Sequence, residues 1–417
     1  MFKDILRSTY NCSCGQIHTM SLQRIVCEEN ALDAAPQIIA EYSKNNKAVM
    51  ICDDNTYIAA GKALENGFNF HQIIKLASTD LHANEKAVDA VLALVNPDAD
   101  LFVAVGSGTI HDVTRYVAAQ MKTDFISVPT APSVDGFVST VAAMTWHGAK
   151  KTLPAVAPIA MVADLSIIAA APQRLIAAGV GDMIGKYTSL LDWKISHLVT
   201  DEYICDYLIE LEEAAIKKVV SSIDKISIGD KEAIGNLFYG LVLSGLAMQM
   251  CGNSRPASGS EHHVSHFIEM GAMGLCSDAY HGEKVGVGLS LICDKYHKAV
   301  SLLKNNMKAD YAYTFPKEEI TRVFGTLSDD FFAENENDCL CGVDVKKLSL
   351  YYEDIIKLID KLPSGDEIRA MLKKVNAPST LEDIGVSSEY KEQILSFSPY
   401  VRNRLTFMRI LRLFNNI

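Results

Sequence analysis

The sequence predicts an α/β domain with a parallel sheet, residues 1–164, followed by an all-helical domain, residues 165–417. Short aliphatic runs alternate with helical patterns in the first part of the chain, which is typical of a doubly wound sheet. Such runs stop near Asp164, and amphipathic helical patterns then follow one another to the end of the chain. The 417 residues, 49% of them hydrophobic, are enough to bury more than one core.

Four runs in the first part have the length and composition of buried strands. A segment between two of them, residues 82–95, has apolar residues at helical spacing. Strands and helices that alternate in this way predict a ligand site at the carboxyl ends of the strands. The predicted strands are residues 47–52, 72–77, 101–105 and 125–128.

In the second part, residues 201–223 illustrate the helical pattern. Their apolar side chains form one continuous stripe, as expected for a helix that packs on one face. Repetition of such patterns predicts a domain without strands. The stripe consists of Ile204, Tyr207, Leu208, Leu211, Ala214, Ala215, Val219 and Val220.

Charge and hydropathy favour a small soluble ligand as partner. The net charge of −12 and the isoelectric point near 5.4 give no general attraction to nucleic acid or to an anionic membrane. No run of about twenty apolar residues is present, and the N-terminal segment lacks the apolar core of a secretion signal. We therefore expect a cytoplasmic protein.

The ten cysteines are too few for a disulfide-rich secreted scaffold. Two close pairs stand out, Cys12 with Cys14 in CSCGQIH, which also holds His18, and Cys339 with Cys341 in CLC. Neither pair has the C-x-x-C spacing or the four-ligand set of a structural zinc site. From spacing alone we expect ordinary thiols of turns or packing at both places.

A glycine-rich turn follows the third predicted strand in the segment VAVGSGTIHD. Gly106 and Gly108 permit close approach of a phosphate, and Thr109 can open a helix whose N–H groups face that charge. A lone G-x-G is also common in turns that need glycine for geometry alone. Asp53 or Asp54 ends the first predicted strand, where a carboxylate can accept hydrogen bonds from an adenosine ribose and favours NAD over NADP.

The segment VPTAPSVD follows the fourth predicted strand. Thr130 and Ser133 can hydrogen-bond a cofactor, and Asp135 lies at the end of the sheet where ligands bind. A proline-rich turn with an Asx hydrogen bond explains the same residues equally well.

Three residues of the helical part have the chemistry of a metal site: Asp182, His262 and His281. One carboxylate and two imidazoles suit zinc, nickel or iron(II), with coordination positions left for substrate. Taken alone, Asp182 suits a helix N-cap better. His266 lies one helical turn after His262 and shares its face, whereas the intervening His263 points to solvent or into packing.

Five motifs together resemble a known family. VAVGSGTIHD, VPTAPSVDGFVS, AGVGDMIGKY, SGSEHHVSH and YHGEKVGVG occur in the order and roughly the spacing of the iron-type (group III) alcohol dehydrogenase superfamily. Within it the chain looks most like the glycerol-1-phosphate dehydrogenase branch, in particular the bacterial form encoded near arabinose genes. The resemblance covers about residues 20 to 300 and implies a Rossmann-like domain followed by a helical domain, as in dehydroquinate synthase.

The resemblance also implies roles for individual residues. Asp182, His262 and His281 would bind the metal, Asp135 and His266 would contact substrate and take part in catalysis, and Asp182 would also face the substrate. Related iron-dependent enzymes carry a further histidine where this chain has Lys186, which favours a three-ligand site. The implied cofactor-binding set is Asp53, Gly106, Gly108, Thr109, Ile110, His111, Asp112, Thr130, Ser133 and Ser139.

The implied reaction is reduction of dihydroxyacetone phosphate to sn-glycerol 1-phosphate by NADH or NADPH, a step of lipid metabolism, in a homodimer or larger homo-oligomer with bound zinc or nickel. The substrate phosphate needs cations, and Lys150, Lys151 and Arg255 are the candidates. Paired lysines are also common in solvated loops. The alternatives are a dehydrogenase of unphosphorylated glycerol, a lyase of the dehydroquinate synthase type, and a binding protein that has kept only the fold.

Overall fold

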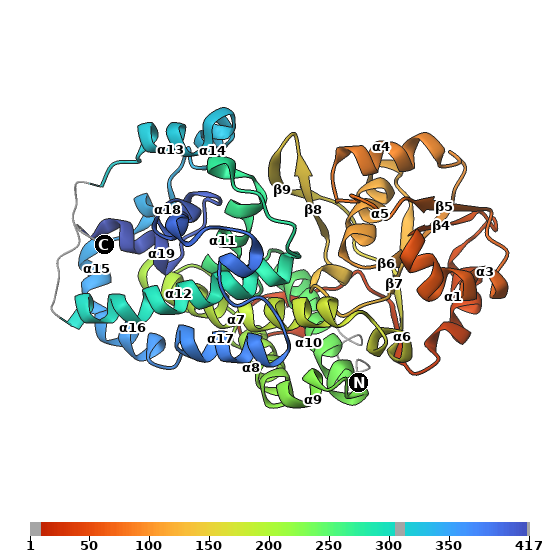
Figure 1. Ribbon diagram of the computed structural model, residues 1–417, viewed down its shortest axis with the longest axis horizontal. Coiled ribbons are helices and arrows are strands. Elements are labelled where there is room, and N and C mark those ends of the chain that lie inside the picture. The colour runs from red at the N-terminus through yellow and green to blue at the C-terminus, as the bar shows by residue number, and fades with distance from the viewer. Residues whose placement is uncertain (1–9, 305–312, 415–417) are drawn as a thin grey trace. The chain divides into compact units, whose positions relative to one another are not determined.

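The computed structural model describes residues 10–304 and 313–414 (Figure 1). Packing divides the chain into two units, residues 1–179 with 221–252, and residues 180–220 with 253–417. The sequence predicted a single boundary after residue 164. The observed division differs because helix α10 (Lys231–Cys251) packs against α6 (Leu165–Ala169) and against the turn η3 (Gly136–Val138), both of which belong to the first unit.

The first unit contains a six-stranded sheet with the order β3-β10-β7-β6-β4-β5, in which every pairing is parallel. The four predicted strands are confirmed as β4, β5, β6 and β7. Sequence analysis missed β3, an edge strand that is only half-buried, and β10. The strands are β3 (Arg24–Glu28), β4 (Ala48–Asp53), β5 (Gln72–Leu76), β6 (Leu101–Gly106), β7 (Asp124–Pro129) and β10 (Ala160–Asp164).

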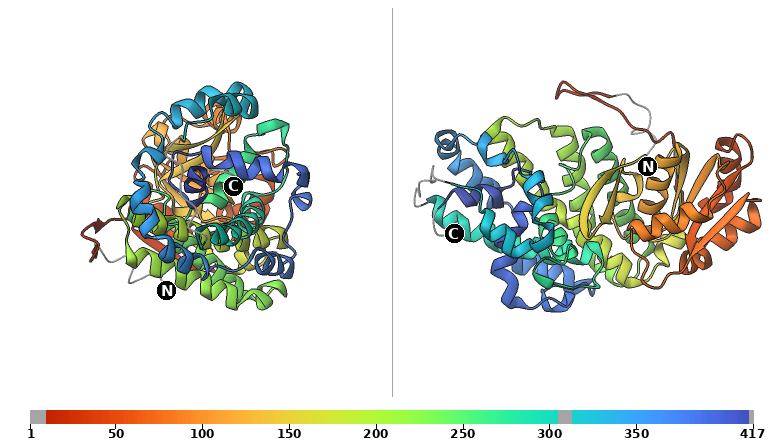
Figure 2. Two further views of the ribbon diagram at one scale, coloured as in Figure 1. Left: turned by 90° about the vertical axis from the view of Figure 1, so that its left-hand side faces the viewer. Right: turned by 90° about the horizontal axis from the view of Figure 1, so that it is seen from above.

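Helices cover both faces of this sheet (Figures 1 and 2). Val49 and Ile51 of β4 pack in one core with residues of α4 and α5, whereas Met50 packs in the other core with residues of α1 and α3. A strand buried on both faces reads as a continuous apolar run rather than an alternating one, which is why β4 could be predicted. The helices are α1 (Ala35–Tyr42), α3 (Lys62–Gly67), α4 (Glu85–Leu94) and α5 (Gly108–Met121).

The first unit also holds an antiparallel hairpin that the sequence analysis did not predict. Its strands, β8 (Val141–Trp146) and β9 (Ala149–Pro154), pair from Val141 with Pro154 to Trp146 with Ala149. His147 and Gly148 connect them with φ angles of 52° and 81°, the left-handed values that a two-residue hairpin turn requires.

The turn before this hairpin depends on one buried guanidinium group. Arg115 of α5 is fully buried and donates hydrogen bonds to the carbonyl oxygens of Phe137 (3.1 Å), Ser139 (3.1 Å) and Val141 (2.9 Å), and also to that of Gly136. These carbonyls belong to the turn η3 and to the segment that leads from it into β8. Arg115 thus attaches the segment after β7 to the helix that follows β6.

The second unit is helical in its described residues, as predicted. The predicted helix at 201–223 begins later, as α8, and its stripe is only partly correct: Ala214 is exposed, while Ile209 and Ile216 are buried. Its helices are the C-terminal part of α7 (Gln173–Thr200), α8 (Asp206–Ser221), α11 (Ser260–Glu269), α12 (His281–Lys304), α13 (Lys317–Phe324), α14 (Ser328–Glu334), α15 (Val345–Leu350), α16 (Tyr352–Ile359), α17 (Gly365–Lys374), α18 (Lys391–Phe397) and α19 (Phe407–Ile410).

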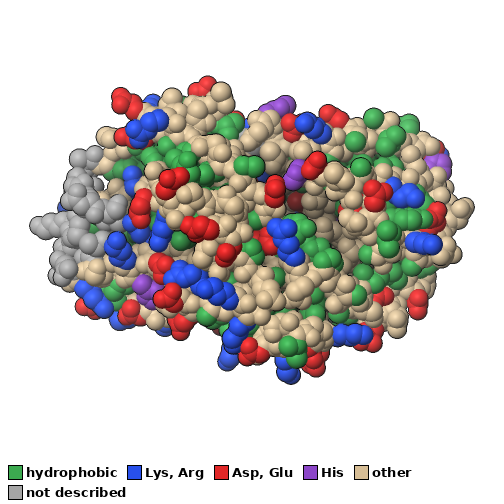
Figure 3. All heavy atoms as spheres, viewed as in Figure 1, with side chains coloured by type: hydrophobic (Ala, Val, Ile, Leu, Met, Phe, Trp, Pro, Cys, Tyr) green, Lys and Arg blue, Asp and Glu red, His purple; other side chains and the backbone are tan. Residues whose placement is uncertain are grey.

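Helix α10 (Lys231–Cys251) is long and apolar enough by length and composition to cross a membrane. However, 72% of its apolar window is buried within the protein, as in the core helix of a soluble protein. Its neighbours in the first unit are α6 (Leu165–Ala169) and α9 (Ile223–Ser227). Acidic and basic side chains are interspersed over the face drawn in Figure 3.

Replacing Arg115 with methionine tests the role of the buried guanidinium. The buried carbonyls would lose their donors, and we expect the free energy of unfolding in urea to fall by about 2–4 kcal/mol. The control is Arg24→Met, which removes only a surface ion pair with Glu41 and should cost less than about 1 kcal/mol. Equal losses in the two variants would contradict this role.

Candidate active site

The first unit forms a cradle for a phosphate at the start of α5. Ser107 precedes the helix, and its side chain does not cap it, so the N–H groups of the first turn are left for an anion. A Cβ atom on Gly106 would lie 2.6 Å from the Cβ of Ile110, and one on Gly108 would lie 3.1 Å from Val134. Glycine is therefore required for this tight turn, and the backbone remains open to a diphosphate.

Asp53 lies at the carboxyl end of β4, the strand next to β6. The sheet extends from β4 to β5 on one side and from β6 to β7 on the other, so the topological switch point is between β4 and β6. The Oδ1 atom of Asp53 accepts hydrogen bonds from the N–H groups of Asn55 (2.8 Å) and Thr56 (2.9 Å). A contact with a ribose would therefore come from Oδ2.

The side chain of His111 holds the turn together. It is fully buried, with Nδ1 2.9 Å from the carbonyl oxygen of Ser107 and Nε2 2.8 Å from Oγ of Ser127. Burial lowers the pKa of His111 to about 3, so the ring is neutral and donates from Nδ1. Both ring nitrogens are thus engaged within the protein, and only the backbone of His111 is left for a cofactor.

The other predicted cofactor residues also lie in the first unit, in the segment after β7 and, for Asp112, on α5. The N–H of Thr130 donates to the carbonyl oxygen of Gly106 (3.0 Å), and Oγ of Ser139 accepts from the N–H of Val141 (3.1 Å). Ser133 is buried, and Asp112 lies 3.7 Å from Arg115. The structure therefore groups these residues at the carboxyl end of the sheet, as the strand order predicts.

Asp135, a predicted catalytic residue, also belongs to the first unit. Its carboxylate is nearly buried, and Oδ2 accepts a hydrogen bond from Oγ of Ser244 on α10 at 3.0 Å. Sequence analysis did not single out Ser244, because only the fold brings α10 to the VPTAPSVD loop.

In the second unit, Asp182, His262 and His281 form one cluster, with one ligand atom from each within 4.8 Å of the others. Asp182 lies inside α7 and is fully buried, so the N-cap interpretation is wrong. His262 lies in the first turn of α11, and His281 is the first residue of α12. Three helices thus bring together residues up to 99 positions apart in the chain.

Two glycines beside Asp182 allow the helices to approach. A Cβ atom on Gly181 would lie 2.2 Å from the carbonyl oxygen of Gly282, and one on Gly185 would lie 2.7 Å from a methyl carbon of Val285. Any larger residue would push α7 away from α12. These contacts explain the glycines of the AGVGDMIG segment.

Both histidines are oriented by glutamates. Nδ1 of His262 lies 2.7 Å from Oε1 of Glu261, and Nδ1 of His281 lies 2.9 Å from Oε1 of Glu269. Donation from Nδ1 leaves the lone pair of Nε2 for a metal and increases its basicity. Nε2 of His262 is 3.7 Å from Oδ1 of Asp182, close to the spacing of two ligands of one ion.

Lys186 neutralises much of the buried charge of Asp182. Its Nζ donates to Oδ1 of Asp182 at 2.7 Å and to the carbonyl oxygen of the same residue at 2.9 Å. Burial raises the pKa of Asp182, but Lys186 and the two histidines outweigh this effect, so the pKa is lowered to about 2. The carboxylate is therefore ionised, and the cluster has three candidate ligands.

A buried orphan nitrogen marks the same site. The Nδ1 atom of His266 has no hydrogen-bond partner among the described residues, and its ring stacks 5.8 Å from that of His281. Burial lowers the pKa of His266 well below its usual value, so the ring is neutral. The donor set and this nitrogen together fit a divalent ion with a polar substrate. His263 is buried, as the packing interpretation predicted.

Asp192 is a supporting residue that the sequence analysis missed. Its carboxylate accepts hydrogen bonds from the N–H (2.9 Å) and Oγ (2.8 Å) of Ser260, from the hydroxyl of Tyr296 (2.6 Å) and from the N–H of Phe407 (2.8 Å). These bonds fix the start of α11, two residues before His262. Burial raises the pKa of Asp192 to about 6 despite them. An aspartate directly after two leucines and before a tryptophan, in the run LLDW, was the available signal.

The three predicted phosphate contacts differ in their surroundings. Lys150 and Lys151 lie on β9, and Nζ of Lys150 donates to the carbonyl oxygen of Ala143 at 3.2 Å. Arg255 is buried and bonds Glu202 through Nε at 2.8 Å. It lines a cavity of about 400 Å³ to which none of the metal-ligand candidates contributes. The structure thus gives Arg255 a place away from the metal cluster.

The fold and the site together are those of an oxidoreductase of the iron-type alcohol dehydrogenase class. Residues 26–172 match the family model described as iron-containing alcohol dehydrogenase. An iron-containing alcohol dehydrogenase of Corynebacterium glutamicum is similar in structure, with 14% identity, a TM-score of 0.62, and coverage of 96% of this chain and 97% of that one. The enzyme of the same description from Thermococcus thioreducens has 16% identity, a TM-score of 0.61, and coverage of 96% and 95%.

Proteins with similar sequences identify the family within this class. Glycerol-1-phosphate dehydrogenase [NAD(P)+] of Geobacillus thermodenitrificans is 33% identical over 98% of this chain and 96% of its own length. The protein of that name from Bacillus subtilis is 33% identical over 94% of this chain and 91% of its own length. The chain belongs to the glycerol-1-phosphate dehydrogenase family. The similarity also continues past residue 300, where sequence analysis found only shared helical character.

Replacing Glu261 with glutamine tests the orientation of His262. The amide keeps the shape of the carboxylate but not its charge, so we expect metal affinity to fall about 10- to 100-fold. Competition with a chromogenic chelator measures the affinity. Glu213→Gln, at an exposed glutamate paired with Lys194, is the control and should leave the affinity unchanged. Unchanged affinity in Glu261→Gln would exclude this role.

The neutral buried ring of His111 predicts a pH dependence of stability. The unfolded chain takes up a proton near pH 6.5, whereas the folded protein does so only near pH 3, so stability is lost as the pH falls between these values. In His111→Asn the slope of unfolding free energy against pH, measured from pH 6 to 4.5, should be smaller by up to about 1.4 kcal/mol per pH unit. His82→Asn, at an exposed histidine, should keep the wild-type slope.

Proposed function

We propose that the protein reduces dihydroxyacetone phosphate to sn-glycerol 1-phosphate with NADH or NADPH and catalyses the reverse oxidation. The cluster of Asp182, His262 and His281 is the observation that carries this proposal, because its donor set suits a divalent ion with positions left for substrate. The names of the relatives support the substrate and the cofactor. Zinc or nickel is proposed as the ion, with iron less favoured.

The three ligands would hold an ion that, when bound, polarises the substrate carbonyl as a Lewis acid. Glu261 and Glu269 keep both histidine rings in the tautomer with Nε2 as acceptor. The neutral ring of His266 can accept or supply a proton at Nδ1, the nitrogen without a partner among the described residues. Asp135 is proposed to hold a substrate hydroxyl, with Ser244 fixing one of its carboxylate oxygens.

The first unit is proposed to bind the cofactor. The first turn of α5, with Gly106 and Gly108 before and within it, would bind the diphosphate, and the loop with Thr130, Ser133 and Ser139 would lie nearer the nicotinamide. A ribose contact from Asp53 would favour NAD, since its charge repels a 2′-phosphate. The relatives are named for both cofactors.

We propose that Lys150 or Lys151 of β9 binds the phosphate of the substrate. Successive residues of a strand point to opposite faces, so one of the two ammonium groups offers the positive charge that a phosphorylated triose requires and glycerol does not. Arg255 is less suited, because its guanidinium is held by Glu202 and Leu405. A cytoplasmic location and a homodimer are proposed from the composition and from the family resemblance.

Loss of NADH absorbance with metal-loaded protein tests the reaction. We expect rapid turnover with dihydroxyacetone phosphate and little with dihydroxyacetone. Removal of the metal, or His262→Ala, should abolish turnover while the far-ultraviolet circular dichroism remains that of the wild type. Preference for dihydroxyacetone would indicate a glycerol dehydrogenase, and no net NADH loss with either would point to a lyase.

Single replacements of Lys150 and Lys151 by alanine test the phosphate contact. One of the two variants should raise the KM for dihydroxyacetone phosphate about 10- to 100-fold, the effect of losing a charge-assisted hydrogen bond, and should leave the weak activity on dihydroxyacetone unchanged. Lys86→Ala, at an exposed lysine of α4, is the matched control. Equal losses on both ketones would contradict a phosphate contact.

A further inference from the structure

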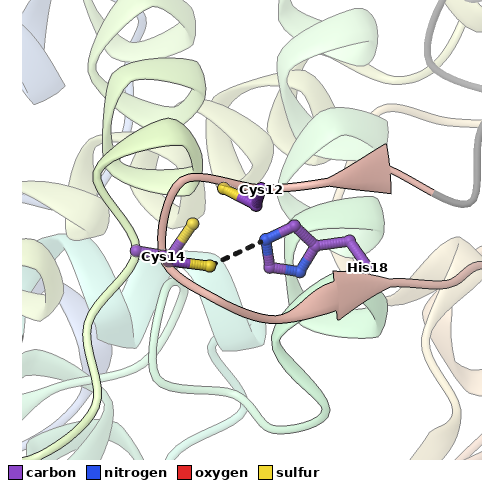
Figure 4. A group of neighbouring side chains, drawn as sticks. Cys12, Cys14 and His18 are labelled. Atoms are coloured by element: carbon purple, nitrogen blue, oxygen red, sulfur yellow. Dashed lines mark hydrogen bonds between the residues drawn. The ribbon is translucent and has the colours of Figure 1, made fainter.

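The N-terminal hairpin gathers two thiols and an imidazole. Its strands are β1 (Tyr10–Asn11) and β2 (Ile17–His18), and the turn between them contains Cys12 and Cys14. The N–H of Gly15 donates to the carbonyl oxygen of Cys12 at 3.0 Å, and Gly15 has a φ of 85°, which favours glycine. Figure 4 shows both sulfur atoms and the ring of His18 directed toward one another.

We propose that Cys12, Cys14 and His18 bind a zinc ion, separate from the cluster of the proposed active site. The C-x-C spacing alone favoured ordinary thiols. The structure adds that one ligand atom from each of the three residues lies within 4.8 Å of the others. Thiolate and imidazole ligands select zinc among the common divalent ions, whereas magnesium and calcium prefer oxygen.

The distances agree with tetrahedral coordination. Sγ of Cys14 lies 3.5 Å from Nε2 of His18. With Zn–S of about 2.3 Å and Zn–N of about 2.0–2.1 Å, a tetrahedral angle separates the two ligand atoms by about 3.5 Å. An ion can therefore enter with little movement of either side chain.

The imidazole is fixed in the tautomer that a metal requires. Nδ1 of His18 lies 2.8 Å from the carbonyl oxygen of Met250 on α10, an acceptor, so Nδ1 carries the proton. Nε2 then presents its lone pair to the sulfur atoms, as in metal-bound histidines whose other nitrogen is held by a carbonyl group. His18 is fully buried, whereas Cys14 is partly exposed and leaves a path for the ion.

The ion would fasten the N-terminal hairpin to the first unit. The hairpin has two residues in each strand, too few for stability on their own. Besides the bond from His18 to Met250, the N–H of Ser21 donates to Oε1 of Gln249 at 2.9 Å, also on α10. The site is therefore structural, and zinc would hold the turn closed over α10. The fourth position of the tetrahedron would be open to water or to a further side chain.

Cobalt substitution tests the site without reference to catalysis. Co²⁺ bound to thiolates gives a sulfur-to-metal charge-transfer absorption that the oxygen and nitrogen ligands of the Asp182 cluster cannot give. We expect this absorption in the wild type and in His262→Ala. It should be lost in Cys12→Ser and in Cys14→Ser and retained in Cys27→Ser, a partly buried cysteine of the same unit. Serine at each other cysteine in turn would identify a fourth thiolate.

Metal analysis gives the second measurement. Wild-type protein should bind two divalent metal ions per chain, and Cys14→Ser should bind one. His18→Gln should lower the affinity of the thiolate site for its metal at least about 10-fold. A cobalt-loaded wild type without charge-transfer absorption would overturn the proposal, and so would a disulfide between Cys12 and Cys14 under reducing conditions. The spectrum of the wild type tests the proposal even if a variant does not fold. The charge-transfer absorption does not depend on dehydrogenase activity, so it remains informative if the proposed function is wrong.

Discussion

The buried negative charge of Asp182 is the constraint on which the second unit depends. A carboxylate removed from water costs several kcal/mol unless it is paired. Lys186 pairs with it from the next turn of α7, and His262 and His281 face it from α11 and α12. The histidines in turn require Glu261 and Glu269 to set their tautomers. The packing of the three helices and the geometry of the metal site therefore depend on each other. Lys186 is the member whose loss would cost most, because it donates directly to the buried carboxylate of Asp182.

Much of the fold could be predicted because parallel strands covered on both faces are continuous apolar runs. β4 and β6 follow this rule and were found within one residue at either end. β3 escaped detection because an edge strand is half exposed and carries charged residues at both ends. The units could not be divided correctly, since the place of α10 depends on contacts with η3 and α6 that no local pattern reveals.

The candidate site, too, could be predicted only in part. The order of the motifs identified Asp182, His262 and His281, and the structure brings them together. The motifs could not show that Asp192 anchors the start of α11 or that Glu202 holds Arg255, because those bonds join residues 53 or more positions apart. The tautomer of His18 is a further case, since its partner Met250 is 232 residues away. The spacing of residues in the sequence shows which side chains could act together, whereas contacts between distant residues determine their tautomers and hydrogen bonds.

The division of the chain also has a consequence for synthesis on the ribosome. The last strand of the sheet ends at Asp164, but α10, which completes the first unit, ends only at Cys251. At ordinary rates of translation α10 emerges on the order of ten seconds after that strand. During this interval the first unit lacks the helix that packs against α6 and η3, and residues 180–220 have already been synthesised without their partners from residue 253 onward. The first unit therefore cannot complete its packing until about 87 residues after its last strand have been translated, so it folds late relative to its own sheet.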